Sequence, residues 1–217
     1  MEKLFKPVLL FVFILSPLWG IAQYSEYEWK ERDSWMDVAG IMELAGIEKG
    51  TAVADIGCHE GYLSIHLARK VGESGKVYAV DVRQDRLDKL KENLKERNLK
   101  NVKVILGDYD NPKLKENSLD AVVIMDTYHE MRDYMEILKH VKKALKPDGR
   151  ILILEKFKHY TRNKSREHQT DAHTLASKYV KKELEDSGFK ITKEVKDFGK
   201  WNNESDKTIW ILVGVKA

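Results

Sequence analysis

The sequence contains a single cysteine, Cys58, among its 217 residues. An internal disulfide bond and a zinc site built from several cysteines are therefore excluded. The sequence also lacks an excess of charge of one sign, because 38 lysines and arginines stand against 35 aspartates and glutamates, a formal net charge of +3. Proteins that bind nucleic acids typically carry a strongly basic surface, so the composition predicts no nucleic-acid partner. Hydrophobic residues at 42% and charged residues at 34% are typical of a globular domain.

A long apolar run occurs only at the N-terminus. Residues 1–22 carry two lysines near their start, Lys3 and Lys6, continue as an apolar stretch and end in Ala22. This pattern is typical of a signal peptide, so we expect cleavage after Ala22 and export of residues 23–217 as a single domain. The alternative is an uncleaved membrane anchor, although the apolar stretch is a little short for a span of about 20 residues. Residues 23–48 are predicted to form a helical cap before the first strand.

The rest of the chain lacks internal repeats and linkers, and strand-like apolar segments alternate with amphipathic helix-like segments. The predicted strands are residues 51–56, 76–82, 102–106, 119–125, 150–155, 189–197 and 208–215, and the predicted helices are residues 24–47, 62–71, 84–97, 134–145 and 172–187. This alternation predicts an α/β fold, a Rossmann-like, doubly wound and mostly parallel seven-stranded sheet. The last two strands have no helix between them, which predicts a C-terminal antiparallel hairpin. The fourth strand has almost no polar residue and is expected to be central.

A glycine-rich phosphate-binding loop is missing from the turn after the first predicted strand, VADIGCHEGYLS (residues 53–64). Gly57 permits the tight turn out of the strand and Gly61 lets the next helix begin close to the sheet, but three side chains, CHE, stand between them. Ligands of such folds bind beyond the carboxyl ends of the strands. Asp55 puts a negative charge there, which disfavours a pyrophosphate and suits a ligand with an ammonium group.

Two further acids follow the next two predicted strands. Asp81 ends the second strand, where an acid can accept hydrogen bonds from both ribose hydroxyls. Asp108 follows the third strand and can accept a hydrogen bond from the exocyclic amine of adenine, and the ring of Tyr109 can stack on the base. Acids for an amino-acid head, a ribose and an adenine fit S-adenosylmethionine better than NAD or FAD. The missing G-x-G-x-x-G spacing also argues against an NAD-dependent oxidoreductase.

The motifs VADIGCHEGY, VYAVDV, GDYD, LDAVVIMDTYHE and LKPDGRILILE, in this order, resemble those of the class I S-adenosylmethionine-dependent methyltransferases. The resemblance covers residues 47–217 and is strongest to the small-molecule branch that includes the ubiquinone and menaquinone biosynthesis methyltransferases. It implies S-adenosylmethionine as the cofactor and methyl transfer to an oxygen or carbon of a small-molecule acceptor. The implied cofactor contacts are Asp55, Gly57 and Gly61 for the methionine part, Asp81 for the ribose and Asp108 for the adenine. The chain differs at His59, where the family usually has a glycine and where a side chain could narrow the cofactor site.

The segment MDTYHEMRD (residues 125–133) follows the fourth predicted strand, where the family places residues that face the methyl donor and the acceptor. Asp126 is predicted to contact the methionine end of the cofactor, and Tyr128 is predicted to contact the substrate. His129 is the candidate general base, because its unperturbed pKa is about 6.5. The alternative for His129 is a structural role in capping or packing the next helix.

The stretch EKFKHYTRNKSREHQTDAHT (residues 155–174) is basic and carries three histidines. It is either a solvated loop or a lid that attracts an acidic acceptor. His173 resembles a histidine that some relatives carry before the last helix, which makes it a second candidate for substrate contact. The spacing of the three histidines matches no compact ligand set, so no metal site is predicted. Trp29 and Arg32, in the N-terminal cap, are further candidates to line the substrate side.

Export and His59 together favour a second hypothesis, an exported binding protein that retains the methyltransferase fold without catalysis. S-adenosylmethionine is made in the cytosol, so an exported methyltransferase has a problem of cofactor supply. Cofactor binding without turnover on any acceptor would distinguish this hypothesis from the enzyme.

Overall fold

The computed structural model describes residues 26–217, so the predicted signal peptide and its cleavage site lie outside the described residues. The helices are α1 (Glu26–Trp35), α2 (Val38–Leu44), α3 (Tyr62–Val71), α4 (Gln84–Glu96), α5 (Tyr134–Ala144), α6 (Arg166–Asp171) and α7 (Ser177–Asp186), with short 3-10 helices η1 (Tyr128–Glu130), η2 (His159–Thr161) and η3 (Trp201–Asn203). The strands are β1 (Ala52–Ile56), β2 (Lys76–Asp81), β3 (Val102–Leu106), β4 (Leu119–Met125), β5 (Leu145–Lys158), β6 (Phe189–Lys200) and β7 (Lys207–Lys216). Between residues 26 and 217, no helix is both long enough and apolar enough to cross a membrane.

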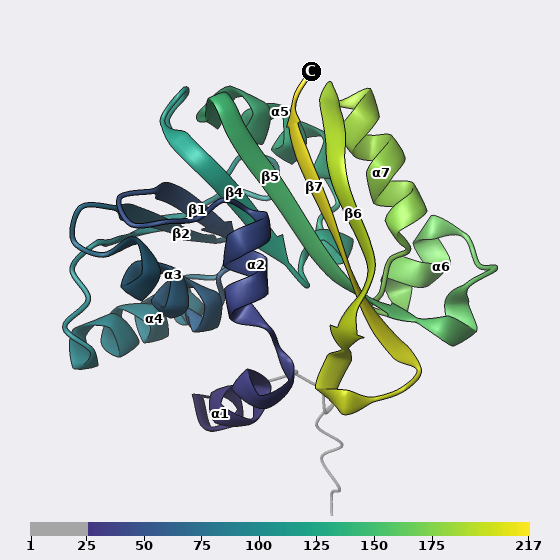
Figure 1. Cartoon of the computed structure of the whole chain (residues 1–217), viewed down its shortest axis with the longest axis horizontal. Helices are drawn as coiled ribbons and strands as arrows, with labels where there is room; N and C mark the ends of the chain where they lie inside the picture. The colour runs from purple at the N-terminus through teal and green to yellow at the C-terminus, as the bar shows by residue number, and fades with distance from the viewer. Residues whose placement is uncertain (1–25) are drawn as a thin grey trace, which may run out of the picture.

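Seven strands form one sheet in the order β3-β2-β1-β4-β5-β7-β6 (Figure 1). β1 pairs in parallel with β2 and β4, and the parallel pairing continues from β2 to β3 and from β4 to β5. β7 is antiparallel to both β5 and β6, so the C-terminal hairpin closes one side of the sheet. The predicted fold is therefore confirmed, including the central position of β4.

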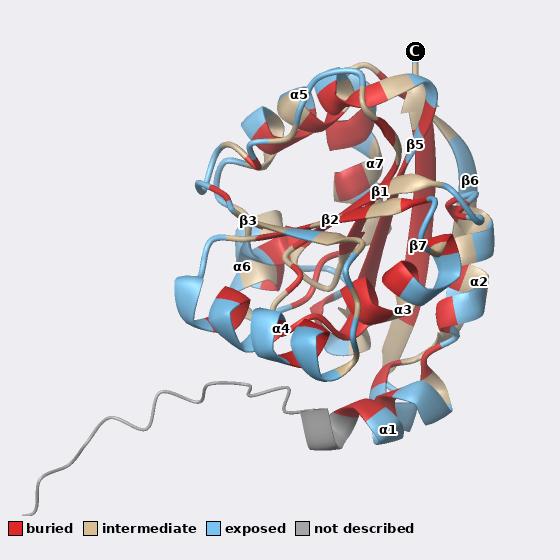
Figure 2. Cartoon of the chain, turned by 90° about the vertical axis from the view of Figure 1, so that its left-hand side faces the viewer, coloured by how far each residue is buried: buried red, intermediate tan, exposed pale blue. Residues whose placement is uncertain are grey.

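Helices cover both faces of the sheet (Figure 2). Buried side chains of α2, α3 and α4, among them Ile41 and Leu67, pack against one face. Those of α5 and α7, among them Leu138, pack against the other. In β4, Val122 belongs to the second cluster and Val123 to the first, because successive side chains of a strand point to opposite faces. Burial on both faces explains why the sequence of β4 is apolar without alternation.

The predicted N-terminal helix is in fact two helices. α1 ends at Trp35 and α2 begins at Val38, and the Asp37 side chain accepts a hydrogen bond from the backbone N–H of Gly40 at 2.8 Å. A capping aspartate favours the start of a new helix over the continuation of the previous one. The break lets α1 lie away from α2 and near η3 (Figure 1), at the edge of the cavity described below.

The basic stretch after the fifth predicted strand also contains regular structure that was not predicted. β5 continues to Lys158, and α6 follows, with the Ser165 side chain as its N-cap. α7 begins at Ser177, later than predicted, because His173 has a left-handed backbone with φ of +51° and cannot belong to a helix. His173 therefore lies in the loop between α6 and α7, where its side chain can reach another element.

Candidate active site

A cavity of about 880 Å³ lies at the carboxyl ends of β1, β2 and β4. Asp55 and Asp81 line it from the ends of β1 and β2, and Asp126 lines it directly after β4. Folds of this kind bind ligands at this edge of the sheet. The cavity continues past β5 to η3, where Lys156 and Trp201 line it. Its volume lies in the upper part of the range for ligand sites, about 300–1,000 Å³.

The turn between β1 and α3 forms one wall of the cavity. Gly57 and Gly61 have backbone φ values of +80° and +99°, a left-handed conformation that favours glycine. A side chain at Gly57 would also overlap that of Thr127. His59 adopts a left-handed φ of +50° although it is not glycine, which costs about 1–2 kcal/mol. Other contacts must therefore hold the turn in place.

Asp81 supplies one of these contacts, with His59, and its other oxygen is held by Arg83 at the start of α4. Its Oδ2 accepts a hydrogen bond from the backbone N–H of His59, and its Oδ1 accepts one from the backbone N–H of Arg83, both at 2.9 Å. Glu60 adds a buried ion pair with Arg86 of α4. Each carboxylate oxygen has a second lone pair, so Asp81 can hold the turn and still accept the predicted ribose hydroxyls.

Asp55 is 2% exposed, and its Oδ2 accepts a hydrogen bond from Oγ of Ser64 at 2.6 Å. Burial raises the pKa of Asp55 to about 7 and the charge of Asp81 adds to this rise, whereas Ser64 and the Arg32 guanidinium lower the pKa. Asp55 therefore changes its charge near neutral pH. Its ionised form can pair with the ammonium group of the predicted cofactor, and its protonated form cannot.

We expect the affinity for S-adenosylmethionine to increase as the pH rises through neutrality. A group with a pKa of about 7 passes from mostly protonated to mostly ionised between about pH 6 and pH 8. If only ionised Asp55 binds the ammonium group, the association constant rises by about fivefold between pH 6 and pH 7, an interval below the pKa of an α-amino group, about 7.7–8.0. Calorimetric titration across it measures the change, and Asp55→Asn, which cannot ionise, should flatten the profile. A wild-type profile as flat as that of the variant would contradict the assignment.

The predicted adenine contacts lie at the outer end of the cavity. Asp108 and Tyr109 both line its wall, and Tyr109 is 72% exposed, so its ring is accessible to a stacked base. Asp108 forms an exposed ion pair with Lys113, with 2.8 Å between Oδ1 and Nζ. The structure thus brings the acids predicted for adenine, ribose and methionine to one cavity, in the order of β3, β2 and β1.

Asp126 lines the same cavity but already has a partner. Both of its carboxylate oxygens accept hydrogen bonds from Nζ of Lys156, at 2.6 and 2.7 Å. The Lys156 ammonium also lies 4.8 Å from the ring centroid of Trp201. A cofactor that contacts Asp126 would therefore share the carboxylate with Lys156, which lies 30 residues further along the chain.

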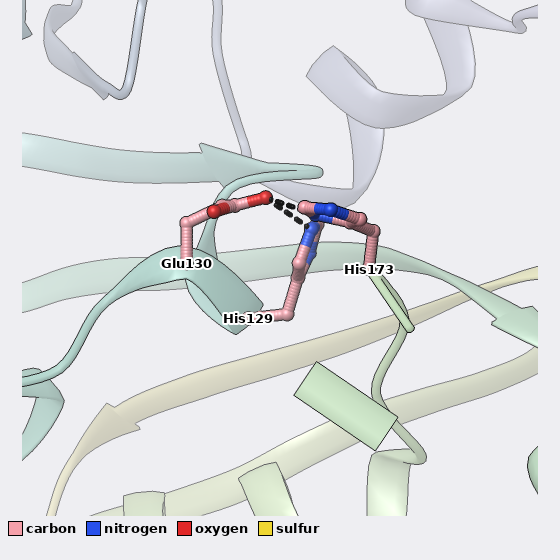
Figure 3. Close-up of side chains that lie close together, drawn as sticks. All are labelled: His129, Glu130 and His173. Carbon is pink, nitrogen blue, oxygen red and sulfur yellow. Dashed lines mark hydrogen bonds and ion pairs between the residues drawn. The ribbon is translucent and has the colours of Figure 1, made fainter. Parts of the chain in front are cut away.

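His129 lies in η1, and its side chain is held between two carboxylates. Its Nδ1 is 2.7 Å from Oε2 of Glu155, and its Nε2 is 3.1 Å from Oε1 of Glu130. His173 contacts the same Glu130 oxygen, with 2.6 Å between Nδ1 and Oε1. The structure thus brings the two predicted acceptor-side histidines together at one carboxylate (Figure 3).

The charge of His129 follows from these contacts. Burial lowers its pKa, but the carboxylates of Glu155 and Glu130 raise it by more, to about 10. The hydrogen bond from His129 in turn lowers the pKa of Glu130 to about 2. His129 is therefore an imidazolium at neutral pH, without a lone pair to accept a proton. The predicted role as general base would require a ligand that separates His129 from its carboxylates.

Two predicted site residues, Gly61 and Tyr128, are not among the residues that line the cavity. Gly61 lies in the turn that forms its wall, whereas Tyr128 points elsewhere. Its side chain is completely buried, and its hydroxyl donates to Oε2 of Glu183 at 2.9 Å. Glu183, on α7, also accepts from Nε of Arg166 at 2.6 Å. This placement ties η1 to α7 on the opposite side from the cavity, and it offers no surface for the predicted substrate contact.

The remaining residues of the site are two that the sequence indicated only weakly, Trp29 and Arg32, and two that it did not indicate as site residues, Glu155 and Lys156. Trp29 and Arg32 do line the cavity from α1, and the Arg32 guanidinium lies 4.9 Å from the ring centroid of Trp201. Glu155 and Lys156 were missed as site residues. An acid that interrupts the apolar run of β5 was the available signal for Glu155, whereas nothing near Lys156 in the sequence indicates its pairing.

Comparison with known proteins identifies the family. A family model described as a methyltransferase domain matches residues 47–204, well over half of the chain. The chain belongs to the class I S-adenosylmethionine-dependent methyltransferases, which confirms the predicted family and its cofactor.

Individual relatives agree with this family. A demethylmenaquinone methyltransferase from Geobacillus sp. (strain WCH70) is 35% identical over 114 residues, 52% of this chain and 49% of the relative. The chain thus spans about half the length of the curated relatives it matches. A SAM-dependent methyltransferase from Aquifex aeolicus has a TM-score of 0.74 at 24% identity, covering 90% of this chain and all of that one. The cyclase SpnF has a TM-score of 0.70 at 17% identity, covering 82% and 80%. These two likenesses show the fold, and the fold alone does not define the reaction.

Proposed function

We propose that this protein transfers a methyl group from S-adenosylmethionine to an oxygen or carbon atom of a small-molecule acceptor. The carrying observation is that the acids predicted for the cofactor line the same cavity as His129, Lys156 and His173. In the proposed reaction the bond between sulfur and methyl carbon breaks, the bond between acceptor and methyl carbon forms, and the acceptor loses a proton. The products are S-adenosylhomocysteine, the methylated acceptor and a proton released to solvent.

Alignment of the two substrates is the main contribution that we assign to the protein. Methyl transfer is an in-line displacement, so most of its catalysis comes from holding the acceptor atom against the methyl group. Asp81, Asp108 and Tyr109 would hold the nucleoside, and Asp55 would hold the ammonium group. The methyl group would then point from the end of β1 toward η1 and β5.

The acceptor side of the cavity favours an oxygen-bearing, electron-rich molecule. Lys156, Lys158 and Lys207 line it together with the indole of Trp201. Ammonium groups stabilise a developing oxygen anion, and an indole face suits a flat ring. The name of the Geobacillus relative makes a ring of the demethylmenaquinone type the first acceptor to test.

Calorimetric titration of the full chain with S-adenosylmethionine, S-adenosylhomocysteine and NAD tests the cofactor half of the proposal. We expect micromolar binding of the first two and none of NAD. Incubation with methyl-labelled cofactor and a panel of phenols, quinols and carboxylic acids then tests the transfer. Absence of binding of both adenosyl compounds would contradict the proposal.

A non-catalytic binding protein is the second candidate, and two observations favour it. His59 occupies a left-handed position that a glycine would fill without cost, and Asp126 is already paired with Lys156. Binding of the cofactor with no transfer to any acceptor would support this candidate.

We also propose that the chain is exported. N-terminal sequencing of the protein found outside the cytosol would test this proposal, because cleavage after Ala22 would leave Gln23 as the first residue.

A further inference from the structure

Three side chains that carry metal-binding atoms converge at the acceptor side of the cavity. His129 and Glu130 belong to η1, and His173 belongs to the loop between α6 and α7, 43 residues further along the chain from Glu130. One ring nitrogen of each histidine and one carboxylate oxygen lie within 4.8 Å of one another. Figure 3 shows both imidazoles directed at the same oxygen of Glu130.

Glu155 fixes the orientation of the His129 ring. Its Nδ1 lies 2.7 Å from Oε2 of Glu155, whose other oxygen accepts the backbone N–H of His129 at 3.1 Å. Glu155 is completely buried, so its carboxylate cannot move away into solvent. A carboxylate that holds one ring nitrogen while the other faces a cavity is the usual outer contact of a metal-binding histidine.

The backbone conformation of His173 belongs to the end of α6. Its left-handed φ of +51° comes directly after the helix. The N–H of His173 donates to the carbonyl of Thr170 at 2.9 Å, and the N–H of Thr174 donates to the carbonyl of Gln169 at 3.1 Å. A left-handed residue with such hydrogen bonds is a common helix ending. The turn brings the 65% exposed side chain of His173 to the cavity, with its ring 6.0 Å from that of His129, between centroids and edge to face.

The three donor atoms would have to move apart to bind a metal ion. Ligands bonded at about 2.0–2.1 Å in a tetrahedral arrangement lie about 3.3 Å apart. The Glu130 oxygen lies 3.1 Å from the His129 nitrogen and 2.6 Å from the His173 nitrogen. The pair of Glu130 and His173 must therefore separate by about 0.7 Å, which its side chains can do because both are more than half exposed.

We propose that His129, Glu130 and His173 bind a divalent transition-metal ion of the borderline class, such as Zn²⁺ or Fe²⁺, at the acceptor side of the cavity. Two imidazoles and one carboxylate match the preferences of these ions and leave coordination positions open toward the cavity. The ion would take the place of the proton on Nε2 of His129, so metal binding releases that proton. The use of those positions, to hold an oxygen of the acceptor, rests on the proposed function. The metal site itself does not depend on it.

A second group of donors, formed by Asp126, His129 and Glu155, is a weaker candidate. Its atoms also lie within 4.8 Å of one another. However, the Asp126 carboxylate is already bound by the Lys156 ammonium, and Glu155 is completely buried. A cation there would meet the charge of Lys156, whereas the site at Glu130 opens to the cavity.

Metal titration of the full chain tests the proposal. Chelator-treated protein is titrated with Zn²⁺ by calorimetry and with Co²⁺ by visible absorption, which reports a four- or five-coordinate site. We expect one site of micromolar or tighter affinity. His173→Ala and Glu130→Gln should each weaken it by at least about tenfold. His168→Ala is the matched control, because His168 is an exposed histidine of α6 and should leave the affinity unchanged.

Absence of a Zn²⁺ or Co²⁺ site in the wild type would overturn the proposal, and so would equal losses in His168→Ala and His173→Ala. Titration of the same samples with S-adenosylhomocysteine separates this result from the proposed function. The metal variants lie outside the predicted cofactor contacts and should keep cofactor binding. If the chain binds metal but not the adenosyl compounds, the metal site is supported and the proposed function is contradicted. If it binds the adenosyl compounds but no metal, the metal site is contradicted and the proposed function is supported.

Discussion

Replacing His129 with alanine is expected to lower the free energy of unfolding by about 3–5 kcal/mol, the usual effect of removing one partner from a buried ion pair. The side chain of His129 is 2% exposed and that of Glu155 is not exposed at all. Alanine would leave the Glu155 carboxylate in the interior without its charged partner, beside a cavity the size of an imidazole. Urea denaturation followed by fluorescence measures the difference.

Two companion variants separate the charge effect from the loss of packing. In the His129→Ala background, Glu155→Gln replaces the unpaired carboxylate with a neutral amide and should recover part of the lost stability. His168→Ala removes an exposed histidine and should change the free energy of unfolding by no more than about 0.5 kcal/mol. Equal stability of His129→Ala and the wild type would show that the pair of His129 and Glu155 does not form in solution.

The stability effect also changes how a loss of turnover in His129→Ala must be interpreted. A general base at His129 predicts a loss of turnover far larger than any loss of cofactor affinity, whereas the alternative structural role predicts no separate loss of turnover. A partly unfolded variant would lose both. Turnover should therefore be compared well below the temperature at which the variant unfolds, with cofactor affinity measured in the same sample.

The sheet was predictable because its signals are local. The apolar run of β4 follows from burial on both faces, and the absence of a helix between β6 and β7 predicts their antiparallel pairing. The break at Asp37 also has a local signal, a capping aspartate three residues before Gly40. That signal was overlooked because the apolar spacing continues through the break.

The cofactor half of the site was predictable for a topological reason. Acids at the carboxyl ends of parallel strands must lie at one edge of the sheet, so Asp55, Asp81 and Asp108 come together whenever the strand order is right. The conformation of the turn was not predictable in the same way. His59 adopts its left-handed backbone because Asp81, 22 residues away, binds its N–H.

The acceptor half depends on contacts between distant segments. Glu130 meets His173, 43 residues later, and Asp126 meets Lys156, 30 residues later, through loops whose path no local pattern indicates. The direction of the Tyr128 side chain could not be predicted from the local sequence either, because a 3-10 turn can direct a side chain to either side of the sheet. Here Glu183 of α7 binds its hydroxyl away from the cavity.

The largest effect on ligand binding is expected for Asp81→Asn. Two hydrogen bonds from ribose hydroxyls to a charged acceptor contribute about 1.5–3 kcal/mol each, and an amide can accept only one of them. Its NH₂ group would also face the backbone N–H of His59 or of Arg83, where the carboxylate now accepts at 2.9 Å. We expect the affinity for S-adenosylhomocysteine to fall by about 100-fold, which corresponds to about 2.7 kcal/mol. Calorimetric titration measures it, with Asp88→Asn, an exposed acid of α4, as the control.

Loss of affinity in Asp81→Asn has two possible causes, a missing ribose contact and a loosened turn. A ligand without the 2′-hydroxyl separates them. If Asp81 accepts that hydroxyl, 2′-deoxy-S-adenosylhomocysteine binds the wild type more weakly than the parent compound, and the variant discriminates much less between the two ligands. If Asp81 acts only on the turn, both proteins discriminate between the ligands to the same extent. An affinity of Asp81→Asn within about threefold of the wild type would exclude both causes and with them the ribose assignment.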